Sequence, residues 1–176
     1  MDLVFATASQ LAQMIRDKEV SAVEVLNAYL EQIAKHNGKI KAIATLDTEK
    51  AKKRAIEADE ALARGENWGA LHGVPVTIKD TLETAELLTT AGYQPLKNYI
   101  PQQDATVAAR LKAAGAIVFA KTNPAKLAGD YQTNNPLFGR TNNPWDLSFT
   151  VGGSSGGSAG AIAAGFSPLD LGSDVS

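Results

Sequence analysis

The sequence predicts an α/β fold in which helices cover a mixed β-sheet. Two short segments have the character of strands: residues 74–78 alternate Val, Val and Ile with other residues, and Ala116–Ala120 is continuously apolar. A continuous apolar run of this length is typical of a strand buried on both faces. Segments with helical periodicity precede both strands, and this alternation indicates a layered α/β architecture.

The composition is that of an ordinary globular protein. The chain has 176 residues, 44% hydrophobic and 20% charged, and we expect residues 1–176 to belong to one domain. A net charge of −2 without a long basic run argues against direct binding of nucleic acid. The absence of cysteine excludes disulfides and thiolate sites, and His36 and His72 are too few for a histidine metal cluster, so no metal or cofactor is expected.

The chain lacks the signals of export or membrane insertion. The segment Met1–Phe5 has no basic region, and no stretch approaches the roughly 18 apolar residues that a membrane span needs. We therefore predict a soluble cytoplasmic protein.

Two capping boxes predict the first helices. Residues 7–10 and 21–24 each place Ser or Thr three positions before Gln or Glu, and apolar residues follow at helical spacing. We expect a short helix after the first box and a helix over roughly 22–36 after the second, ended by Gly38.

A weak strand and a third helix follow. Apolar residues alternate over 39–46, which favours a strand, and Thr48 is expected to cap a helix over 49–64. Alanines would form the buried face of this helix, and its many charges are typical of a solvated face.

The next predicted strand ends at Lys79, and Pro75 favours an edge strand or a strand start because proline lacks the N–H that a sheet needs. Residues 84–101 lack periodicity and are expected to be irregular. Asp104 is expected to cap a helix that buries Val107 and leads into the apolar strand.

Residues 122–144 are rich in Asn, Pro and Gly and predict a long ordered loop. Its large apolar residues are interpreted as packing residues that pin the loop. They are Leu127, Tyr131, Phe138 and Trp145. A buried helix of small residues is expected over 158–165, and a new strand after Ser167.

The most unusual stretch of the sequence is a Gly/Ser loop that leads into this last helix. It contains Gly152, Gly153, Ser154, Ser155 and Gly156. Glycine permits close approach of a ligand, and backbone donors at the start of a helix suit an anion or an oxyanion. We therefore predict a functional site here.

Four other interpretations of the loop fit less well. A phosphate loop of the Walker type needs a lysine at its end, and a dinucleotide fingerprint needs a different glycine spacing. The sequence Gly152–Gly156 matches G-x-S-x-G, but no histidine follows Ser154 to complete an α/β-hydrolase triad. A flexible linker would not run directly into an apolar helix.

The remaining interpretation is a serine-based site whose base is not histidine. Burial lowers the pKa of lysine toward neutrality, so a desolvated lysine is the available general base. Lys79 follows a buried apolar strand and is the lysine whose surroundings best support this role.

Several motifs occur together in the order and spacing of one known family. They are Gly73–Asp80, Asp104–Val107, Gly115–Val118, Lys121–Asn123, Asn142–Asp146 and Gly152–Ser158. With them the sequence resembles the amidase signature family, which hydrolyses or transfers carboxylic amides through a Ser–cis-Ser–Lys triad. The match runs from the first helices to the last residue and corresponds to the N-terminal part of a typical member.

The resemblance implies a role for each matched residue. Lys79 corresponds to the ultimate base, and Ser154 to the bridging serine, held on a cis peptide bond after Gly153 and relaying a proton to Lys79. Ser155 and the neighbouring glycines, Gly152 and Gly156 among them, would shape the loop without direct chemistry.

The resemblance also implies where the nucleophile lies. Gly172–Val175 matches the start of the family motif that ends in the nucleophilic serine, which puts that serine two positions beyond Ser176. Val175 and Ser176 fall in the turn whose backbone N–H groups form the family's oxyanion hole. We therefore expect this chain to be truncated and inactive by itself.

Two functional alternatives stay open beside a free-standing amidase acting on a small-molecule amide. One is the A subunit of a glutamyl-tRNA amidotransferase, although Leu127–Asn135 looks more like a general amidase. The other is a non-catalytic fragment that self-associates or pairs with a missing C-terminal part through an exposed sheet edge.

Overall fold

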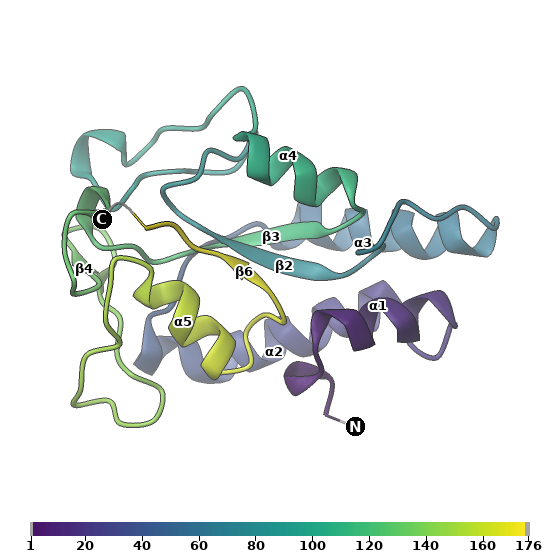
Figure 1. Ribbon diagram of the computed structural model, residues 1–176, viewed down its shortest axis with the longest axis horizontal. Coiled ribbons are helices and arrows are strands. Elements are labelled where there is room, and N and C mark those ends of the chain that lie inside the picture. Colours follow the sequence, from purple (N-terminus) through teal and green to yellow (C-terminus); the bar gives the residue numbers. More distant parts are fainter. Residues whose placement is uncertain (1, 175–176) are drawn as a thin grey trace.

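The computed structural model describes residues 2–174 and has a mixed β-sheet at its centre (Figure 1). Four strands lie in the order β1-β3-β2-β6. Their bounds are Ile43–Leu46 for β1, Pro75–Lys79 for β2, Ile117–Thr122 for β3 and Asp170–Leu171 for β6. β1 is antiparallel to β3, whereas β2 is parallel to both β3 and β6. The predicted α/β class with a mixed sheet is confirmed.

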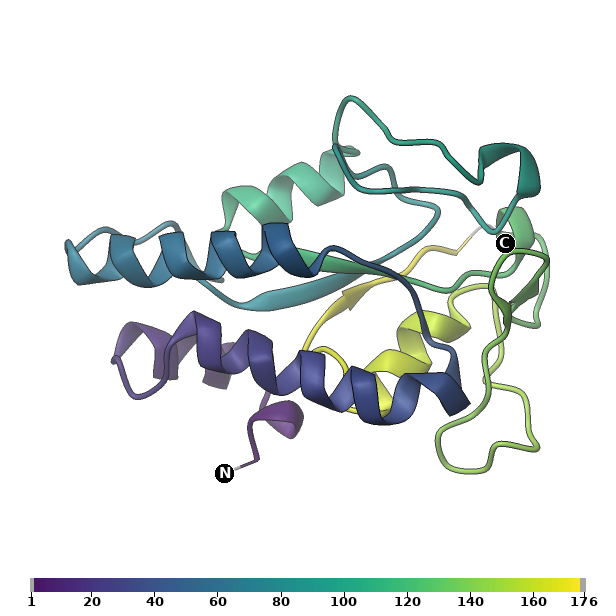
Figure 2. The ribbon, with the colours of Figure 1, turned by 180° about the vertical axis from the view of Figure 1, so that it is seen from behind.

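Helices cover both faces of this sheet. They are α1 (Ala8–Arg16), α2 (Ala22–Ile40), α3 (Thr48–Ala63), α4 (Thr106–Ala113) and α5 (Gly156–Ala163). Figures 1 and 2 show α3 and α4 on one side of the sheet and α1, α2 and α5 on the other. The core between α2 and the sheet includes a stacked pair, Tyr29 and Phe119, with ring centroids 6.5 Å apart. Within residues 2–174, no helix combines the length and the hydropathy needed to cross a membrane.

Short elements complete the fold. They are the 3-10 turns Leu3–Phe5, Gln94–Leu96 and Lys126–Ala128, and a two-stranded ribbon of β4 (Asn134–Asn135) and β5 (Gly139–Arg140). Residues 84–101 are otherwise irregular, as predicted.

Both predicted capping boxes form, but α2 is longer than predicted. The helix continues through Gly38 to Ile40 and ends at Lys41, which adopts a left-handed conformation with φ of 57°. The Asn37 side chain bonds both backbone groups of Ile43, at 2.9 and 3.1 Å. This tie and the burial of Ile40 stabilise the extra turn, so the strand predicted from residue 39 starts only at Ile43.

Two predicted helix caps are wrong, the first because the preceding residue caps the helix and the second because the predicted residue bonds elsewhere. The N-cap of α3 is Asp47, whose carboxylate accepts a hydrogen bond from Lys50 N, so Thr48 is the first helical residue instead. Asp104 does not cap α4, because its carboxylate accepts hydrogen bonds from Ala85 N and the Lys112 ammonium. Val107, predicted to be buried in α4, is 37% exposed.

An irregularity between β2 and β3 decides which way their last side chains point. Pro75 opens β2, a central strand rather than an edge strand, at the one position where its missing N–H is tolerated. The pairing then shifts by one residue at Phe119, so Ile78 pairs with Lys121 and Lys79 with Thr122. Because paired residues share a face and successive residues alternate, Lys79 and Lys121 point to opposite faces of the sheet.

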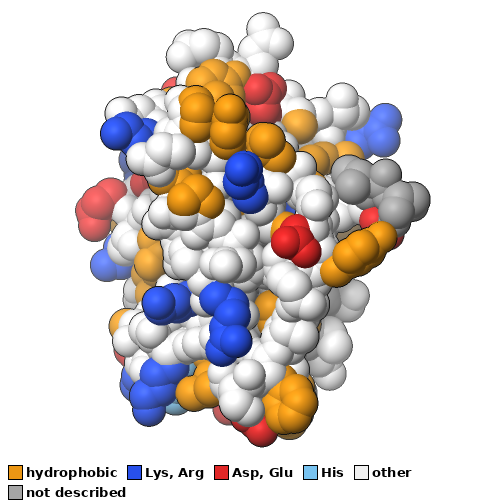
Figure 3. Space-filling model, turned by 90° about the vertical axis from the view of Figure 1, so that its left-hand side faces the viewer, with side chains coloured by type: hydrophobic (Ala, Val, Ile, Leu, Met, Phe, Trp, Pro, Cys, Tyr) orange, Lys and Arg blue, Asp and Glu red, His pale blue; other side chains and the backbone are white. Residues whose placement is uncertain are grey.

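The interpretation of the large apolar residues in the 122–144 loop as packing residues is wrong for three of the four. Leu127 is 52% exposed, Tyr131 79% and Trp145 86%. Figure 3 shows the end of the molecule that carries these loops, where hydrophobic side chains are exposed between positively charged ones. Asn135 holds the loop instead: its amide donates to Asn123 Oδ1 and Pro124 O and accepts from the backbone N–H groups two and three positions further on.

Asp59 provides the first testable prediction. Its carboxylate on α3 accepts hydrogen bonds from the N-terminal N–H groups of α2, Ala22 N at 2.7 Å and Val23 N at 3.2 Å. The variant Asp59→Ala should therefore lower the free energy of unfolding by about 1–2 kcal/mol, the typical effect of losing a helix cap. Urea denaturation followed by circular dichroism measures this, and Glu60→Ala on the exposed face of α3 is the control. Equal stability of the two variants would contradict the predicted cap.

Candidate active site

The site is organised around Lys79, the last residue of β2, and Ser154 in the Gly/Ser loop. The Lys79 side chain is fully buried, and its Nζ donates a hydrogen bond of 2.7 Å to Ser154 Oγ. Nζ also donates to Ser173 O at 3.1 Å and to Ser173 Oγ at 3.0 Å. The peptide bond between Gly153 and Ser154 is cis, as the sequence resemblance implied.

Burial lowers the pKa of Lys79, and the negative charges of Asp174 and Asp170 oppose the shift. A lysine with a lowered pKa holds a larger neutral fraction near neutral pH, and only the neutral amine can accept a proton. The predicted pair of Lys79 and Ser154 therefore meets in the structure, with Lys79 Nζ hydrogen-bonded to Ser154 Oγ.

The glycines of the loop are required by close backbone contacts. A Cβ atom on Gly153 would lie 2.7 Å from the carbonyl carbon of Tyr131. On Gly156 it would lie 2.2 Å from Oγ1 of Thr133. Both distances are shorter than heavy atoms tolerate, so the loop that carries Ser154 can pack against residues 130–133 only with glycine at these two positions.

Thr133 supports the loop, and sequence reasoning missed it because a hydroxyl in a polar segment is an ordinary feature. Its side chain is buried. Oγ1 donates to Gly152 O at 2.8 Å and accepts from Gly156 N at 2.9 Å, while the Thr133 N–H also donates to Gly152 O. One threonine thus fixes the loop on both sides of Ser154.

The segment after β6 forms the other wall of the site. Gly172 and Ser173 lie beside the Gly/Ser loop, and Ser155 makes two hydrogen bonds to the backbone of Ser173. The predicted participation of the 172–175 motif is therefore consistent with the position of its first two residues. Val175 and Ser176, predicted to support the oxyanion, lie outside the described residues.

A cavity of about 160 Å³ opens next to Ser154. Its lining residues are Ala128, Gly129, Asp130, Tyr131, Gly153, Ser154 and Asp174. A small group bound there would lie against the Ser154 peptide.

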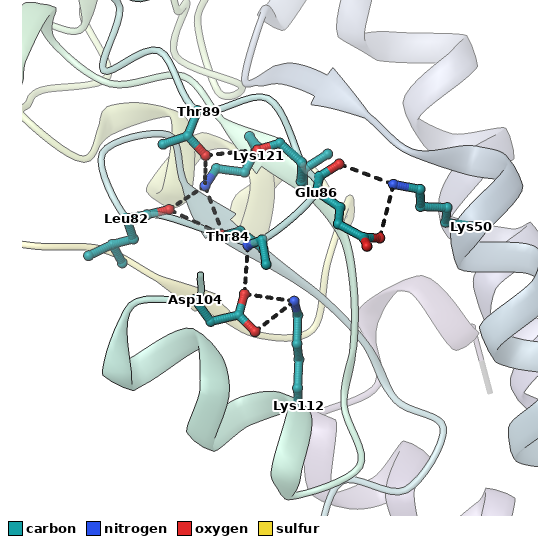
Figure 4. Close-up of polar contacts among 10 residues, drawn as sticks. Lys50, Leu82, Thr84, Glu86, Thr89, Asp104, Lys112 and Lys121 are labelled. Carbon is teal, nitrogen blue, oxygen red and sulfur yellow. Dashed lines mark hydrogen bonds and ion pairs between the residues drawn. The ribbon is translucent and has the colours of Figure 1, made fainter. Parts of the chain in front are cut away.

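A second buried lysine, Lys121, lies on the face of the sheet opposite to Lys79, and Figure 4 shows its contacts. Its ammonium donates to Leu82 O, to Thr84 Oγ1 at 3.0 Å and to Thr89 Oγ1 at 3.2 Å. Burial lowers the pKa of Lys121 to about 8, although Asp80 raises it in part. Sequence analysis assigned it no role of its own, because the predicted strand stopped at Ala120.

The segment Leu82–Thr89, which Lys121 holds by these hydrogen bonds, forms a turn that is also bonded to residues of α3 and α4, as Figure 4 shows. The Lys50 ammonium of α3 donates to Glu86 O, and Asp104 joins Ala85 N to Lys112 of α4. Another cavity, of about 390 Å³, lies between this turn, α3 and α4. Lys121 and its turn therefore support the fold on the face away from Ser154.

The buried lysine at the end of β2 and the serine that it bonds are the two residues that the resemblance to the amidase signature family singled out. The family model named Amidase matches residues 24–176, and the chain belongs to this family.

Known proteins resemble the chain over nearly its whole length. It is 47% identical, over 175 residues, to the A subunit of the glutamyl-tRNA(Gln) amidotransferase of Carboxydothermus hydrogenoformans, covering 99% of this chain and 36% of that protein. A crystal structure of an amidase superposes with a TM-score of 0.89 at 36% identity, covering 96% of this chain and 38% of that one. The structure of a bacterial aryl acylamidase of the amidase signature family superposes with a TM-score of 0.89 at 26% identity. This match covers 94% of this chain and 35% of that one. The chain spans about a third of the length of these relatives.

Lys121 generates a prediction about pH and stability. Its pKa is about 8 in the folded chain against an ordinary 10.5, so the unfolded chain holds more protons between these values and stability rises with pH in that window. From pH 8 to 9.5 the wild type should gain about 1–2 kcal/mol of unfolding free energy relative to Lys121→Met. Urea titrations at both pH values test this. Lys53→Met, on an exposed lysine, is the control, and a parallel pH dependence of wild type and Lys121→Met would refute the prediction.

Proposed function

We propose that this chain carries the base and the proton relay of a site that cleaves carboxylic amides, with Lys79 as general base and Ser154 as relay. The observation that carries the proposal is the 2.7 Å hydrogen bond between the buried Lys79 ammonium and a serine hydroxyl on a cis peptide bond. Membership of the Amidase family supports the same chemistry.

The hydrogen bonds of Lys79 fit both of its protonation states. The ammonium has three N–H donors, and they match Ser154 Oγ, Ser173 O and Ser173 Oγ. The neutral amine has two N–H donors and one lone pair. If the two donors remain on Ser173, the lone pair points at Ser154 Oγ, from which it can take a proton.

The proposed reaction is an acyl transfer. A serine hydroxyl attacks the amide carbon and passes its proton to Ser154 Oγ, while the Ser154 proton moves to Lys79 Nζ. The C–N bond then breaks, the amine leaves with the proton returned through Ser154, and water hydrolyses the acyl-enzyme by the same relay. Backbone N–H groups of the turn at Val175 and Ser176 would stabilise the oxyanion, and the loop that contains Gly152 and Gly156 would support that turn.

We propose that the attacking serine follows the segment Gly172–Asp174, as the family motif implies. The hydrogen bonds of Ser173 to Lys79 and Ser155 support this, because they bring Ser173, near the start of that motif, to the lysine that also bonds the relay serine. Ser155, Gly153 and the other loop glycines would then shape the site without exchanging protons.

A second candidate function is that of an amidotransferase A subunit. The 47% identity to the Carboxydothermus hydrogenoformans protein favours it, against the general amidase that the 127–135 segment suggested. The word subunit in that protein's name implies partner chains, whereas a free-standing amidase hydrolyses a small-molecule amide by itself. Affinity purification of the tagged full-length gene product would distinguish them, since only the amidotransferase component should retain stoichiometric partners through gel filtration.

Substitution of the two proposed residues tests the mechanism. In the full-length gene product that carries this sequence, Lys79→Met and Ser154→Ala should each reduce amide hydrolysis about 10²- to 10⁴-fold, because either change interrupts proton transfer. Release of ammonia or amine from a panel of amides is the readout, and Lys53→Met on the surface of α3 should retain full activity.

Covalent labelling provides a second readout of the same prediction. A fluorophosphonate probe should modify a serine that follows Asp174, and peptide mapping should show weaker labelling in Lys79→Met. Labelling of Ser154 would contradict its assignment as the relay and make it the nucleophile. Full activity of Lys79→Met would overturn the proposal itself.

A further inference from the structure

The side chain of Ser155 does not play the part that its position in the fold favours. Ser155 is the N-cap residue of α5, where a serine hydroxyl ordinarily accepts a hydrogen bond from the first turn of the helix. Among the described residues, no such capping bond from Ser155 is formed. The hydroxyl is therefore directed elsewhere.

Other residues cap α5 in its place. Gly156 N donates to Thr133 Oγ1 at 2.9 Å, and Gly157 N donates to Asn123 O at 3.0 Å. Two of the N–H groups that lack partners within the helix are thus satisfied from distant parts of the chain. This arrangement leaves Ser155 Oγ available without weakening the helix start.

Ser155 Oγ instead clamps the peptide groups of Ser173. It donates to Ser173 O at 2.9 Å and accepts from Ser173 N at 3.1 Å. The two segments approach so closely that a Cβ on Gly172 would lie 3.0 Å from Ser155 Oγ and 3.1 Å from its Cβ. Glycine at position 172 makes the clamp sterically feasible.

The clamped residue is the one that orients Lys79. Ser173 O accepts from both Ser155 Oγ and Lys79 Nζ, which uses the two lone pairs of that carbonyl. A rotation of the Ser173 peptide would move Ser173 O and Ser173 Oγ, which are two of the three acceptors of the Lys79 ammonium. Ser155 therefore influences the orientation of Lys79 indirectly, through its hydrogen bonds to Ser173.

We propose that Ser155 is a positioning residue of the amide-cleaving site: by fixing Ser173, it aims the lone pair of neutral Lys79 at Ser154 Oγ. The inference rests on the proposed function and extends it, since Ser155 was expected only to shape the loop. Ser155 touches neither the reacting amide nor the transferred proton, so its contribution is to orientation alone.

The variant Ser155→Ala in the full-length gene product tests this proposal. It should lower kcat about 10- to 100-fold with KM within about twofold, because an orienting contact acts on proton transfer more than on substrate binding. The matched control is Ser167→Ala. Ser167 is buried and, like Ser155, makes two hydrogen bonds to backbone groups, Thr77 N and Leu169 O, but on the N-terminal side of β6.

Equal losses of kcat in the two variants would overturn the proposal, because both remove one hydroxyl that makes two backbone hydrogen bonds. A rise in KM without a fall in kcat in Ser155→Ala would overturn it as well. Similar unfolding midpoints of the two variants ensure that the comparison is not one of stability.

A measurement without turnover separates this inference from the proposed function. The Lys79 pKa can be followed by NMR titration of its ¹³Cε and ¹⁵Nζ signals. Burial is the main cause of the lowered Lys79 pKa, and release of Ser173 would admit water to the ammonium, so Ser155→Ala should raise this pKa while Ser167→Ala leaves it unchanged. An unchanged pKa in Ser155→Ala would refute the coupling even if the protein hydrolyses no amide. A raised pKa in an inactive protein would support the coupling and count against the proposed function.

Discussion

A buried ammonium group that must keep all its hydrogen-bond partners is the constraint on which the site depends. Removing the Lys79 charge from water costs several kcal/mol, and only well-placed acceptors offset that cost. The three acceptors come from two segments far from β2 in sequence, Ser154 and Ser173. The Gly/Ser loop and the end of β6 must therefore both reach the same strand end, and the glycines at 153 and 172 allow this approach.

The arrangement of strands and helices brings these segments together at the carboxyl end of β2. The parallel strands β2 and β6 end on the same edge of the sheet, as parallel strands must, and α5 begins there too (Figure 1). Ligand sites in open α/β sheets commonly lie beyond the carboxyl ends of the strands, for the same topological reason. The turn held by Lys121 reinforces the opposite face, so the two buried lysines divide structural and proposed chemical roles between them.

Features set by neighbouring residues could be predicted from the sequence, and features set by distant ones could not. The capping boxes, the end of β2 at Lys79 and the Gly/Ser loop follow from local patterns and agree with the structure. Thr133 and the Ser155 clamp depend on contacts with segments about 20 residues away, which periodicity does not record. The exposed side chain of Trp145 was misjudged for the same reason, since hydrophobicity indicates burial only when the fold supplies a neighbour.

The single-residue shift at Phe119 changes the register between β2 and β3, and this register decides on which face of the sheet each buried lysine lies. With uninterrupted pairing from Val76 and Val118, Lys79 would lie directly beside Lys121 on one face. Two unscreened cations about 5 Å apart would repel by about 3 kcal/mol. A slip of one residue at the end of β3 would therefore be expected to harm the protein more than most substitutions, because it would bring together two charges that the irregular pairing keeps on opposite sides of the sheet.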